Sequence, residues 1–268
     1  MNLLEVGGLK VWERASGHVI VRDVSFSLKQ GECLAIVGES GSGKSLTCRT
    51  IMRLQSSRLA HSGRLLFKGM DLNALSARQF RKLRGRHICM IMQNGMRAFD
   101  PSRAIGVHLR ETIMQHYDWS HSEFIDNITS AMASVMLKEP LDMMRKYPYQ
   151  LSGGTLQRVM IALAIALKPD LIIADEPTTA LDTITQYEVI EQFMKLRERI
   201  GCSMIFVSHD LGVVRKIGDH VLVMKDGEVV EQGSVSSVYD APRHAYTKYL
   251  LTSRAMLRNH FRQVMGVL

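Results

Sequence analysis

One octet of residues has the side chains and the spacing that bind phosphate groups. Residues 38–45 have the sequence GESGSGKS, which fits the pattern G-x-x-x-x-G-K-[ST] of a phosphate-binding loop. Its glycines let successive backbone N–H groups turn inward around an anion. Lys44 is placed to reach the terminal phosphates, and the Ser45 hydroxyl is placed to bind Mg²⁺. We therefore expect ATP and Mg²⁺, and not merely a glycine-rich turn, at Gly38, Glu39, Ser40, Gly41, Ser42, Gly43, Lys44 and Ser45.

Two carboxylates follow a buried strand further along the chain. Asp175 and Glu176 come directly after the apolar run 171–174, where unpaired charges would be costly. Asp175 has the position of an outer ligand of Mg²⁺, and Glu176 has that of a general base for an attacking water molecule. The pair therefore predicts hydrolysis of the bound nucleotide.

Polar residues also follow two other apolar runs. Gln93 comes after the run 88–92, where open α/β sheets bind ligands, and there it would bind Mg²⁺ or position water. His209 follows the run 203–207, and its expected neighbours are Glu176 and the γ-phosphate. Taken alone, each residue has a plainer interpretation, as a surface glutamine and a structural histidine.

Residues 152–154 and Trp12 can each be interpreted in two ways. Ser152, Gly153 and Gly154 precede the apolar run 159–167, so they form either an anion site at a helix start or only the helix N-cap. Trp12 lies upstream of the octet, and it either stacks on a nucleobase or packs on an antiparallel sheet.

The elements that must position these residues follow from the pattern of apolar residues. Short apolar runs predict strands at 9–12, 18–21, 25–28, 33–37, 65–67, 88–92, 171–174, 203–207 and 221–224, the last in a hairpin with 228–233. Helices are expected at 46–54, 75–86, 104–117, 121–136, 141–146 and 159–167. Asp100-Pro101-Ser102 would cap the helix at 104–117. The sequence therefore predicts an α/β core with a mostly helical insertion.

The composition limits the class of protein. The 268 residues are 46% hydrophobic, enough for a buried core, and the net charge is +8. A basic chain suits nucleic acid, a phosphorylated ligand or an anionic membrane, but without a long Lys/Arg run a solvated basic surface is favoured. Four scattered cysteines without a C-x-x-C pair indicate buried thiols in a reducing compartment. With no secretory signal and no apolar run near the ~20 residues that span a bilayer, we expect a soluble protein.

In their order, the motifs resemble the nucleotide-binding subunit of an ABC transporter over residues 1–250. The order is the octet, Gln93, Leu151-Ser152-Gly153-Gly154, Asp175-Glu176-Pro177, Ala180-Leu181-Asp182 and His209. The resemblance implies a P-loop NTPase core of the α/β class with a mostly parallel sheet. It also implies an N-terminal antiparallel β subdomain, an inserted α-helical subdomain at about 95–160 and a short basic helical tail at 251–268.

The resemblance also assigns roles to individual residues. Trp12 would stack on adenine, and Mg²⁺ would be held by Ser45, the Q-loop residue Gln93 and Asp175. The catalytic residues would be Lys44, Glu176 and the switch histidine His209.

Other roles would lie at a contact with a second subunit. The signature that touches ATP held by the opposite subunit would comprise Ser152, Gly153, Gly154 and Gln157. Asp182 would be the D-loop residue at the same interface. Thr155 departs from the family, which usually has glutamine there, whereas Gln157 and Arg158 fit its pattern.

Several stretches are most similar to importers of oligopeptides, dipeptides and nickel. They are Met92-Gln93-Asn94, Ala98-Phe99-Asp100-Pro101, 182–186 and 241–248. No cysteine follows Cys202, whereas many peptide importers continue into a cysteine-bearing extension. This difference and Thr155 favour an ATPase that energises import of nickel or of a metal–metallophore complex, with a dipeptide or oligopeptide importer as the alternative.

The same resemblance implies partners and a location. The partners are a second ATPase subunit, expected to be a paralogue in a head-to-tail dimer, two transmembrane permeases and an extracytoplasmic solute-binding protein. The chain would be peripheral on the cytoplasmic face of the cell inner membrane, without nucleic acid. A soluble ABC ATPase of DNA repair would need a long coiled coil before Leu151, and a translation-factor ATPase would need two cassettes. Motifs alone do not separate importers from exporters.

Overall fold

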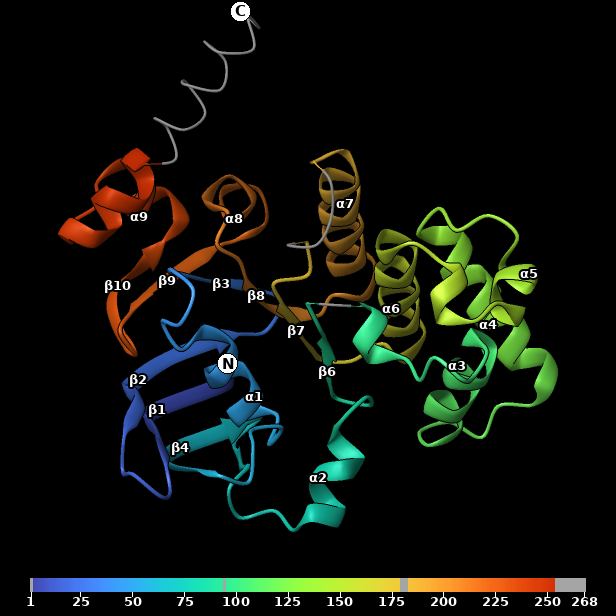
Figure 1. Cartoon of the computed structure of the whole chain (residues 1–268), viewed down its shortest axis with the longest axis horizontal. Coiled ribbons are helices and arrows are strands. Elements are labelled where there is room, and N and C mark those ends of the chain that lie inside the picture. The colour runs from blue at the N-terminus through green and yellow to red at the C-terminus, as the bar shows by residue number, and fades with distance from the viewer. Residues whose placement is uncertain (1, 94, 179–182, 254–268) are drawn as a thin grey trace, which may run out of the picture.

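Two β-sheets form the framework of the protein (Figure 1). The computed structural model describes residues 2–93, 95–178 and 183–253. The larger sheet has the order β10-β9-β3-β8-β7-β6, with β10 antiparallel and the other strands parallel. Its strands are β3 (Cys33–Val37), β6 (Ile88–Ile91), β7 (Leu171–Asp175), β8 (Ser203–Val207), β9 (His220–Lys225) and β10 (Glu228–Ser234). The expected α/β core with a mostly parallel sheet is confirmed.

The smaller sheet is antiparallel and has the order β2-β1-β4-β5. Its strands are β1 (Asn2–Glu13), β2 (Val19–Lys29), β4 (Leu59–Phe67) and β5 (Met70–Asp71). The prediction of separate strands at 18–21 and 25–28 is wrong. Asp23 has a left-handed φ of 49°, and the pairing of β1 with β2 has register shifts, so β2 bends at an irregularity without ending. The sheet also takes β4 and β5 from the chain after the octet.

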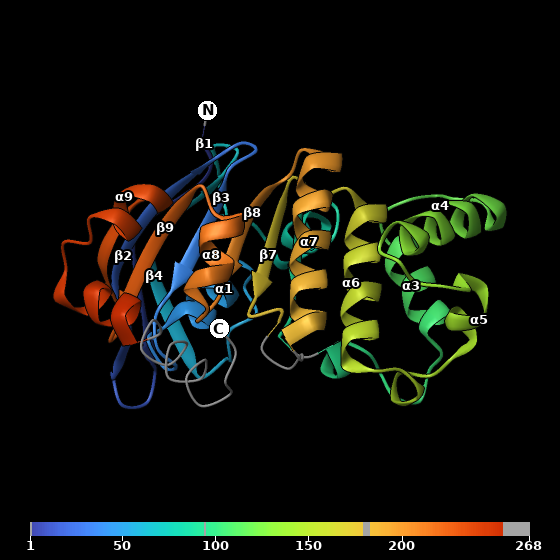
Figure 2. The same ribbon diagram turned by 90° about the horizontal axis from the view of Figure 1, so that it is seen from above.

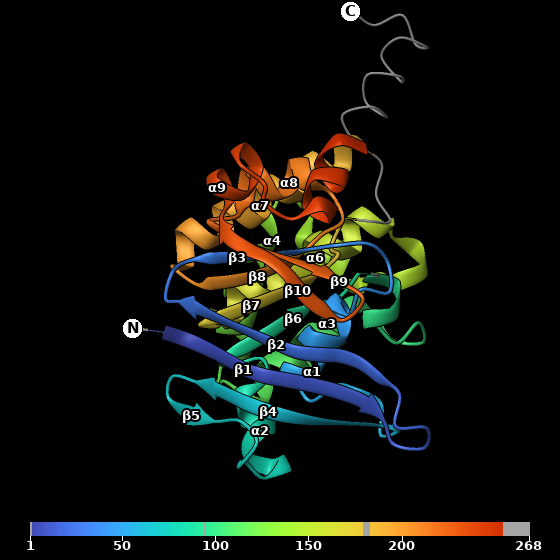
Figure 3. The same ribbon diagram turned by 90° about the vertical axis from the view of Figure 1, so that its left-hand side faces the viewer.

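Helices cover the larger sheet on both faces. α1 (Lys44–Ile51) lies between the two sheets, and α7 (Thr183–Ile200), α8 (Leu211–Ile217) and α9 (Val235–Asp240) lie on the opposite face (Figure 3). Every residue of β3 is buried. Leu34 and Ile36 pack in the core around α1, whereas Ala35 and Val37 pack with α8. Alternate residues of β3 therefore pack on opposite faces of the sheet, as in a strand that is buried on both sides. This packing holds the carboxyl end of β3, where the octet begins, in a fixed position.

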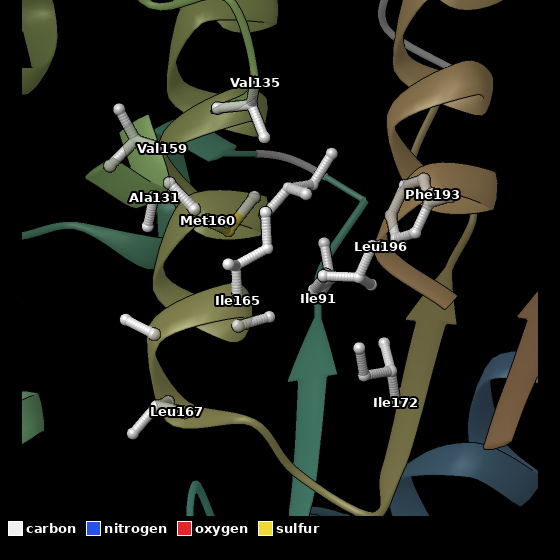
Figure 4. Packing of buried hydrophobic residues seen from close by; sticks show 14 of the residues in the cluster. Ile91, Ala131, Val135, Val159, Met160, Ile165, Leu167, Ile172, Phe193 and Leu196 are labelled. Atoms are coloured by element: carbon white, nitrogen blue, oxygen red, sulfur yellow. The ribbon is translucent and has the colours of Figure 1, made fainter. Parts of the chain in front are cut away.

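Four helices lie beyond the β6 edge of the larger sheet (Figures 1 and 2). A fifth helix, α2 (Ala77–Leu83), comes directly before β6 in the chain. The four helices beyond the edge are α3 (Ile105–Met114), α4 (His121–Ser134), α5 (Pro140–Arg145) and α6 (Gly153–Leu167), with 3₁₀ turns η1 (Gly95–Ala98) and η2 (Pro148–Gln150). These helices were expected and are confirmed. In α6, Met160 and Ile165 pack in one cluster with Ile91 of β6 and Phe193 of α7 (Figure 4). A helix that is apolar nearly all round belongs in the interior, so α6 joins the helical part to the core.

The start of α3 differs from the prediction. Asp100 accepts hydrogen bonds from the N–H and the hydroxyl of Ser102, at 2.9 and 2.7 Å, and the N-cap residue is Ala104, which has no side-chain cap. The N–H of Ile105 donates to the carbonyl of Lys146 at 2.9 Å. The short Asp100 side chain therefore closes a local turn, and a tertiary contact satisfies the helix end.

The C-terminal part of the described chain is a helix over residues 245–253. Most of the tail expected at 251–268 lies outside the described residues. Within the described ranges, no helix has both the length and the apolar character needed to cross a bilayer.

Candidate active site

The octet forms the loop between β3 and α1. Gly38, Gly41 and Gly43 have positive φ angles of 151°, 86° and 97°, which glycine adopts without strain. A Cβ atom at Gly38 would lie 2.1 Å from the Met224 carbonyl oxygen, so the loop needs glycine there to pack against β9. Among the described residues, the buried hydroxyl of Ser42 has no hydrogen-bond partner. A curved glycine-rich loop with a buried hydroxyl that lacks a partner suits a phosphate ligand.

Lys44 lies inside this loop with 4% of its surface exposed. Its Nζ donates hydrogen bonds to the carbonyl oxygens of Gly38 and Glu39 at 2.9 and 2.8 Å and lies 3.8 Å from Oε1 of Glu176. Burial lowers the pKa of Lys44, and the nearby Glu176 and Asp175 offset only part of that shift. Because a buried ammonium gains from an anionic partner, terminal phosphates are a favourable replacement for the carbonyls.

Asp175, the last residue of β7, contacts the first turn of α1. The Ser45 hydroxyl donates to Oδ1 of Asp175 at 2.6 Å, and Nη2 of Arg49 lies 3.5 Å from Oδ2. Burial raises the pKa of Asp175, and the Ser45 hydrogen bond and Arg49 oppose this shift. Two hard oxygen donors side by side fit Mg²⁺, as the sequence predicts. The sequence reasoning missed Arg49, although its spacing of four from Ser45 places both on one helix face.

Glu176 is the point where three strand ends meet. Its Oε2 accepts a hydrogen bond from Nε2 of Gln93 at 3.3 Å and lies 3.5 Å from Nδ1 of His209. These residues follow β7, β6 and β8, so the predicted neighbourhood of His209 and Glu176 is confirmed. Glu176 has a φ of 47°, in a region that is sparsely populated by non-glycine residues and is concentrated at functional sites. Its N–H donates to the carbonyl of Val207 at 3.1 Å, which holds the turn.

The serine and glycines at 152–154 lie at the start of α6, away from the octet in the sequence. Ser152 is the N-cap, and its hydroxyl accepts from the N–H of Thr155 at 3.2 Å and contacts Oγ1 of Thr155 at 2.8 Å. Ser152 is therefore the N-cap of α6, and an anion site at this helix start stays a prediction. Ser152 and Gly153 are exposed, and a Cβ at Gly153 would meet nothing within 4 Å. This end of α6 leaves room for a ligand.

Gln157 lies one turn further into α6 and is 2% exposed. A Cβ at Gly95 would come within 2.9 Å of the Cβ of Leu156 and within 3.4 Å of the N of Gln157. Gln157 is therefore buried within this chain, where its Nε2 has no hydrogen-bond partner among the described residues, and its contact with a nucleotide of another subunit stays a prediction. The close approach also places the turn after Gln93 directly on α6.

Trp12 and Asp182 are the two remaining predicted site residues. Trp12 is half-buried near the end of β1, opposite Val19 of β2 and Ala60 of β4. This position fits a tryptophan packed on the antiparallel sheet, and stacking on adenine stays a prediction. Asp182 lies outside the described residues.

Comparison with known proteins decides the family. The ABC transporter family matches residues 21–179, more than half of the chain. The chain belongs to the ABC transporter family. The chain is therefore an ATP-binding and ATP-hydrolysing cassette.

Individual relatives agree with this assignment. The cassette is 49% identical over 265 residues to the metal-staphylopine import system ATP-binding protein CntD of Staphylococcus aureus, covering 99% of this chain and 98% of the relative. It is 42% identical to the glutathione import ATP-binding protein GsiA of Salmonella paratyphi A, where 94% of this chain covers 42% of the relative. The solved structure of the ATP-binding cassette MJ0796, a dimer bound to ADP and phosphate, matches 87% of this chain and 98% of its own with a TM-score of 0.76 and 27% identity.

Proposed function

We propose that this cassette energises import of a metal–metallophore complex. The observation that carries the proposal is the 49% identity to CntD, which extends over nearly the whole length of both chains. A second candidate is import of a small peptide, which the 42% identity to GsiA favours. That similarity covers 42% of GsiA, so the metal–metallophore complex is the better supported solute.

The proposed catalytic roles follow from the contacts at the site. The backbone N–H groups of the loop that point inward bind the phosphates, and Lys44 exchanges its two carbonyl partners for terminal phosphate oxygens. Glu176 accepts the proton of the attacking water, and His209 lies beside the same carboxylate. Ser45, Gln93 and Asp175 would hold Mg²⁺, which would neutralise negative charge on the phosphates.

The exposed start of α6 supports a site completed by a second cassette. Ser152, Gly153 and Gly154 would close over the ATP of a head-to-tail partner, which we propose to be a paralogue, with Asp182 and Gln157 near that interface. The N-terminus of α6 favours an anion there. The dimer of the solved relative MJ0796 supports such a pairing.

Two permeases and an extracytoplasmic solute-binding protein complete the proposed transporter, with this cassette peripheral on the cytoplasmic face of the cell inner membrane.

In our division of the chain, residues 1–250 form the nucleotide-binding domain, and about 95–160 form its helical subdomain. The helical subdomain carries exposed apolar side chains suited to a permease helix, namely Met114, Met136, Leu141 and Tyr149.

The solute is tested with the assembled transporter in proteoliposomes. The rate of ATP hydrolysis is measured with the solute-binding protein loaded with metal–staphylopine, with glutathione or with nothing. We expect metal–staphylopine to stimulate hydrolysis several-fold, and a Lys44→Ala cassette to abolish that stimulation. Stimulation by glutathione alone would replace this proposal by the peptide alternative.

A further inference from the structure

The peptide group between Gly38 and Glu39 is held from two sides. Its carbonyl oxygen accepts a hydrogen bond from Nζ of Lys44 at 2.9 Å, and its N–H donates to the hydroxyl of Tyr246 at 2.9 Å. In a trans peptide the C=O and N–H groups point in opposite directions. Lys44 therefore contacts this peptide from inside the loop, and Tyr246 contacts it from outside, 207 positions further along the chain.

Tyr246 is fixed by its surroundings. Its side chain is 6% exposed and packs with the β3 and α8 residues on that face of the sheet, and Nζ of Lys225 lies 5.2 Å from its ring centre. Burial raises the pKa of Tyr246, so the hydroxyl stays protonated at neutral pH. The ring therefore holds its hydroxyl at one place beside the loop.

The segment that carries Tyr246 is anchored to β10. The carboxylate of Glu231 accepts hydrogen bonds from the N–H groups of Arg243 and His244, at 2.8 and 3.0 Å. These two residues come directly before the helix that begins at 245. A continuous path of contacts therefore runs from Glu231 through the start of this helix to Tyr246 and the N–H of Glu39.

A second outer contact shows that the loop is supported on this side. The N–H of Gly227, in the turn between β9 and β10, donates to the carbonyl of Ser42 at 3.2 Å. Both outer contacts use backbone groups of the loop and leave its inward face to the ligand. The N–H groups of a phosphate-binding loop that bind the anion must already point inward before it arrives. The Glu39 N–H points outward and finds its partner in Tyr246.

We infer that Tyr246 is a positioning residue for ATP, which acts by fixing the orientation of the Gly38–Glu39 peptide and, with it, the resting place of Lys44. Tyr246 touches the loop from outside and makes no contact with the reacting atoms. The inference rests on the proposed nucleotide site at residues 38–45. It assigns to the C-terminal segment 241–250 a share in the affinity for ATP.

The first test is Tyr246→Phe, which keeps the ring and removes the hydroxyl. Loss of the hydrogen bonds between the Tyr246 hydroxyl and Glu39 predicts a rise of about 2- to 10-fold in the dissociation constant for MgATP, measured by calorimetry on the full chain. The turnover number of the assembled transporter at saturating ATP should change less than about twofold, because the catalytic groups are intact. Tyr249→Phe is the matched control, since Tyr249 lies in the same helix and is 56% exposed; its dissociation constant should equal that of the wild type.

A second variant tests the path and does not depend on how well Tyr246→Phe folds. Glu231→Gln replaces one of two accepting oxygens by an amide donor, so it should also weaken MgATP binding. In the Tyr246→Phe background the same change should have no further effect, because its influence passes through the tyrosine hydroxyl. Additive effects of the two substitutions, or wild-type affinity in Tyr246→Phe, would overturn the inference.

Lys44→Ala separates this inference from the site itself. If Lys44→Ala binds MgATP as the wild type does, the nucleotide site is wrongly placed and the inference fails with it. If Lys44→Ala loses affinity while Tyr246→Phe and Glu231→Gln keep it, the site stands and the role of Tyr246 is wrong.

Discussion

Asp175 and Glu176 are neighbours in the chain, but the structure gives them different environments. Asp175 continues the line of β7, has 2% of its side chain exposed and accepts the Ser45 hydroxyl. At Glu176 the backbone turns to a left-handed φ of 47°, and the side chain, 17% exposed, faces Gln93, His209 and Lys44. A single turn of the backbone therefore separates the proposed Mg²⁺ ligand, Asp175, from the proposed general base, Glu176.

Removing the proton-accepting oxygen of Glu176 should stop ATP hydrolysis without preventing ATP binding. In Glu176→Gln the amide keeps the shape of the side chain but cannot accept the proton of water, so we expect turnover to fall by about 10²-fold or more. The dissociation constant for MgATP should change little. Phosphate release by the assembled transporter measures the first, and calorimetry measures the second. Glu198→Gln, an exposed carboxylate on α7, is the control, and normal turnover in Glu176→Gln would refute the role of general base.

The raised pKa of Asp175 predicts a conflict between stability and function. A folded-state pKa above the unfolded one means that the ionised carboxylate is less favourable in the folded protein, so at neutral pH it lowers the free energy of unfolding. Asp175→Asn should therefore stabilise the nucleotide-free cassette by about 1 kcal/mol and weaken Mg²⁺-dependent ATP binding. Urea unfolding without nucleotide and calorimetry with MgATP test both effects. A less stable Asp175→Asn protein would contradict this electrostatic account.

At the scale of elements, the carboxylate of Asp170, which directly precedes β7, is one of the contacts between the two sheets. Asp170 lies 2.7 Å from Nζ of Lys68, which is in the turn between β4 and β5, and 2.8 Å from Nδ1 of His87, which precedes β6. Its own N–H donates to the His87 carbonyl at 3.0 Å. The antiparallel sheet, β6 and β7 therefore meet at Asp170, at the edge opposite the nucleotide site.

This contact should make stability depend on pH in the acidic range. Burial raises the pKa of Asp170, but hydrogen bonds and charges from Lys68 and His87 outweigh it and leave the pKa below its usual value. A depressed folded-state pKa contributes stability above the unfolded pKa, and that stability is lost as pH falls through the folded pKa. Asp170→Asn should lower the free energy of unfolding by about 1 kcal/mol at pH 7, and the difference from wild type should shrink below about pH 4.

Urea denaturation at several pH values measures this difference. Asp118→Asn, an exposed aspartate, serves as the control and should show no such convergence with the wild type. A destabilisation by Asp170→Asn that stays constant down to the lowest pH would mean that the amide disturbs packing and not charge.

At the scale of the whole molecule, our proposal makes the active site incomplete in one chain. The proposed catalytic residue Glu176 follows β7, at the ends of the parallel strands, whereas Ser152 and Gly153 lie exposed at the start of α6 in the helical part. A head-to-tail pair would bring the helix start of one cassette to the phosphates of the other. Binding of ATP would then favour the closed pair and hydrolysis the open one, which is a two-state element able to drive transport.

The composite site predicts asymmetry in mixed transporters. A cassette with Ser152→Arg should bind ATP at its own loop, with an unchanged dissociation constant, but should reduce hydrolysis at its partner's site by at least about tenfold, because the arginine fills the space over the partner's phosphates. Single-turnover measurements with one labelled site distinguish the two. Ser122→Arg, at an exposed position on α4, should be neutral. A dilute monomer that hydrolyses ATP as fast as the assembled transporter would exclude the composite site.

Local patterns in the sequence determined most of the elements and the chemistry of the site. The octet, the apolar runs before Gln93, Asp175 and His209, and the helices of the insertion all depend on periods of two or 3.6 residues and on glycine placement. Parallel strands end at one edge of a sheet, so His209 was expected near Glu176, and the two lie 3.5 Å apart. That Gln93 also contacts Glu176 depends on the strand order, in which β6 lies next to β7. These patterns arise from steric contacts between neighbouring residues and from the burial of apolar side chains, so a short stretch of sequence is enough to show them.

Tertiary structure alone decided which distant groups make contact. Arg49 pairs with Asp175 across 126 positions, and Tyr246 reaches Glu39 across 207; no local pattern contains such pairs. At the start of α3, the Ile105 N–H donates to the Lys146 carbonyl, and Asp100 does not cap the helix. Strand β2 continues through Asp23 because the register of its pairing with β1 shifts there. Each of these outcomes depends on how separate elements pack, since the free energy of a long-range contact is set by the whole fold and not by the residues on either side of it.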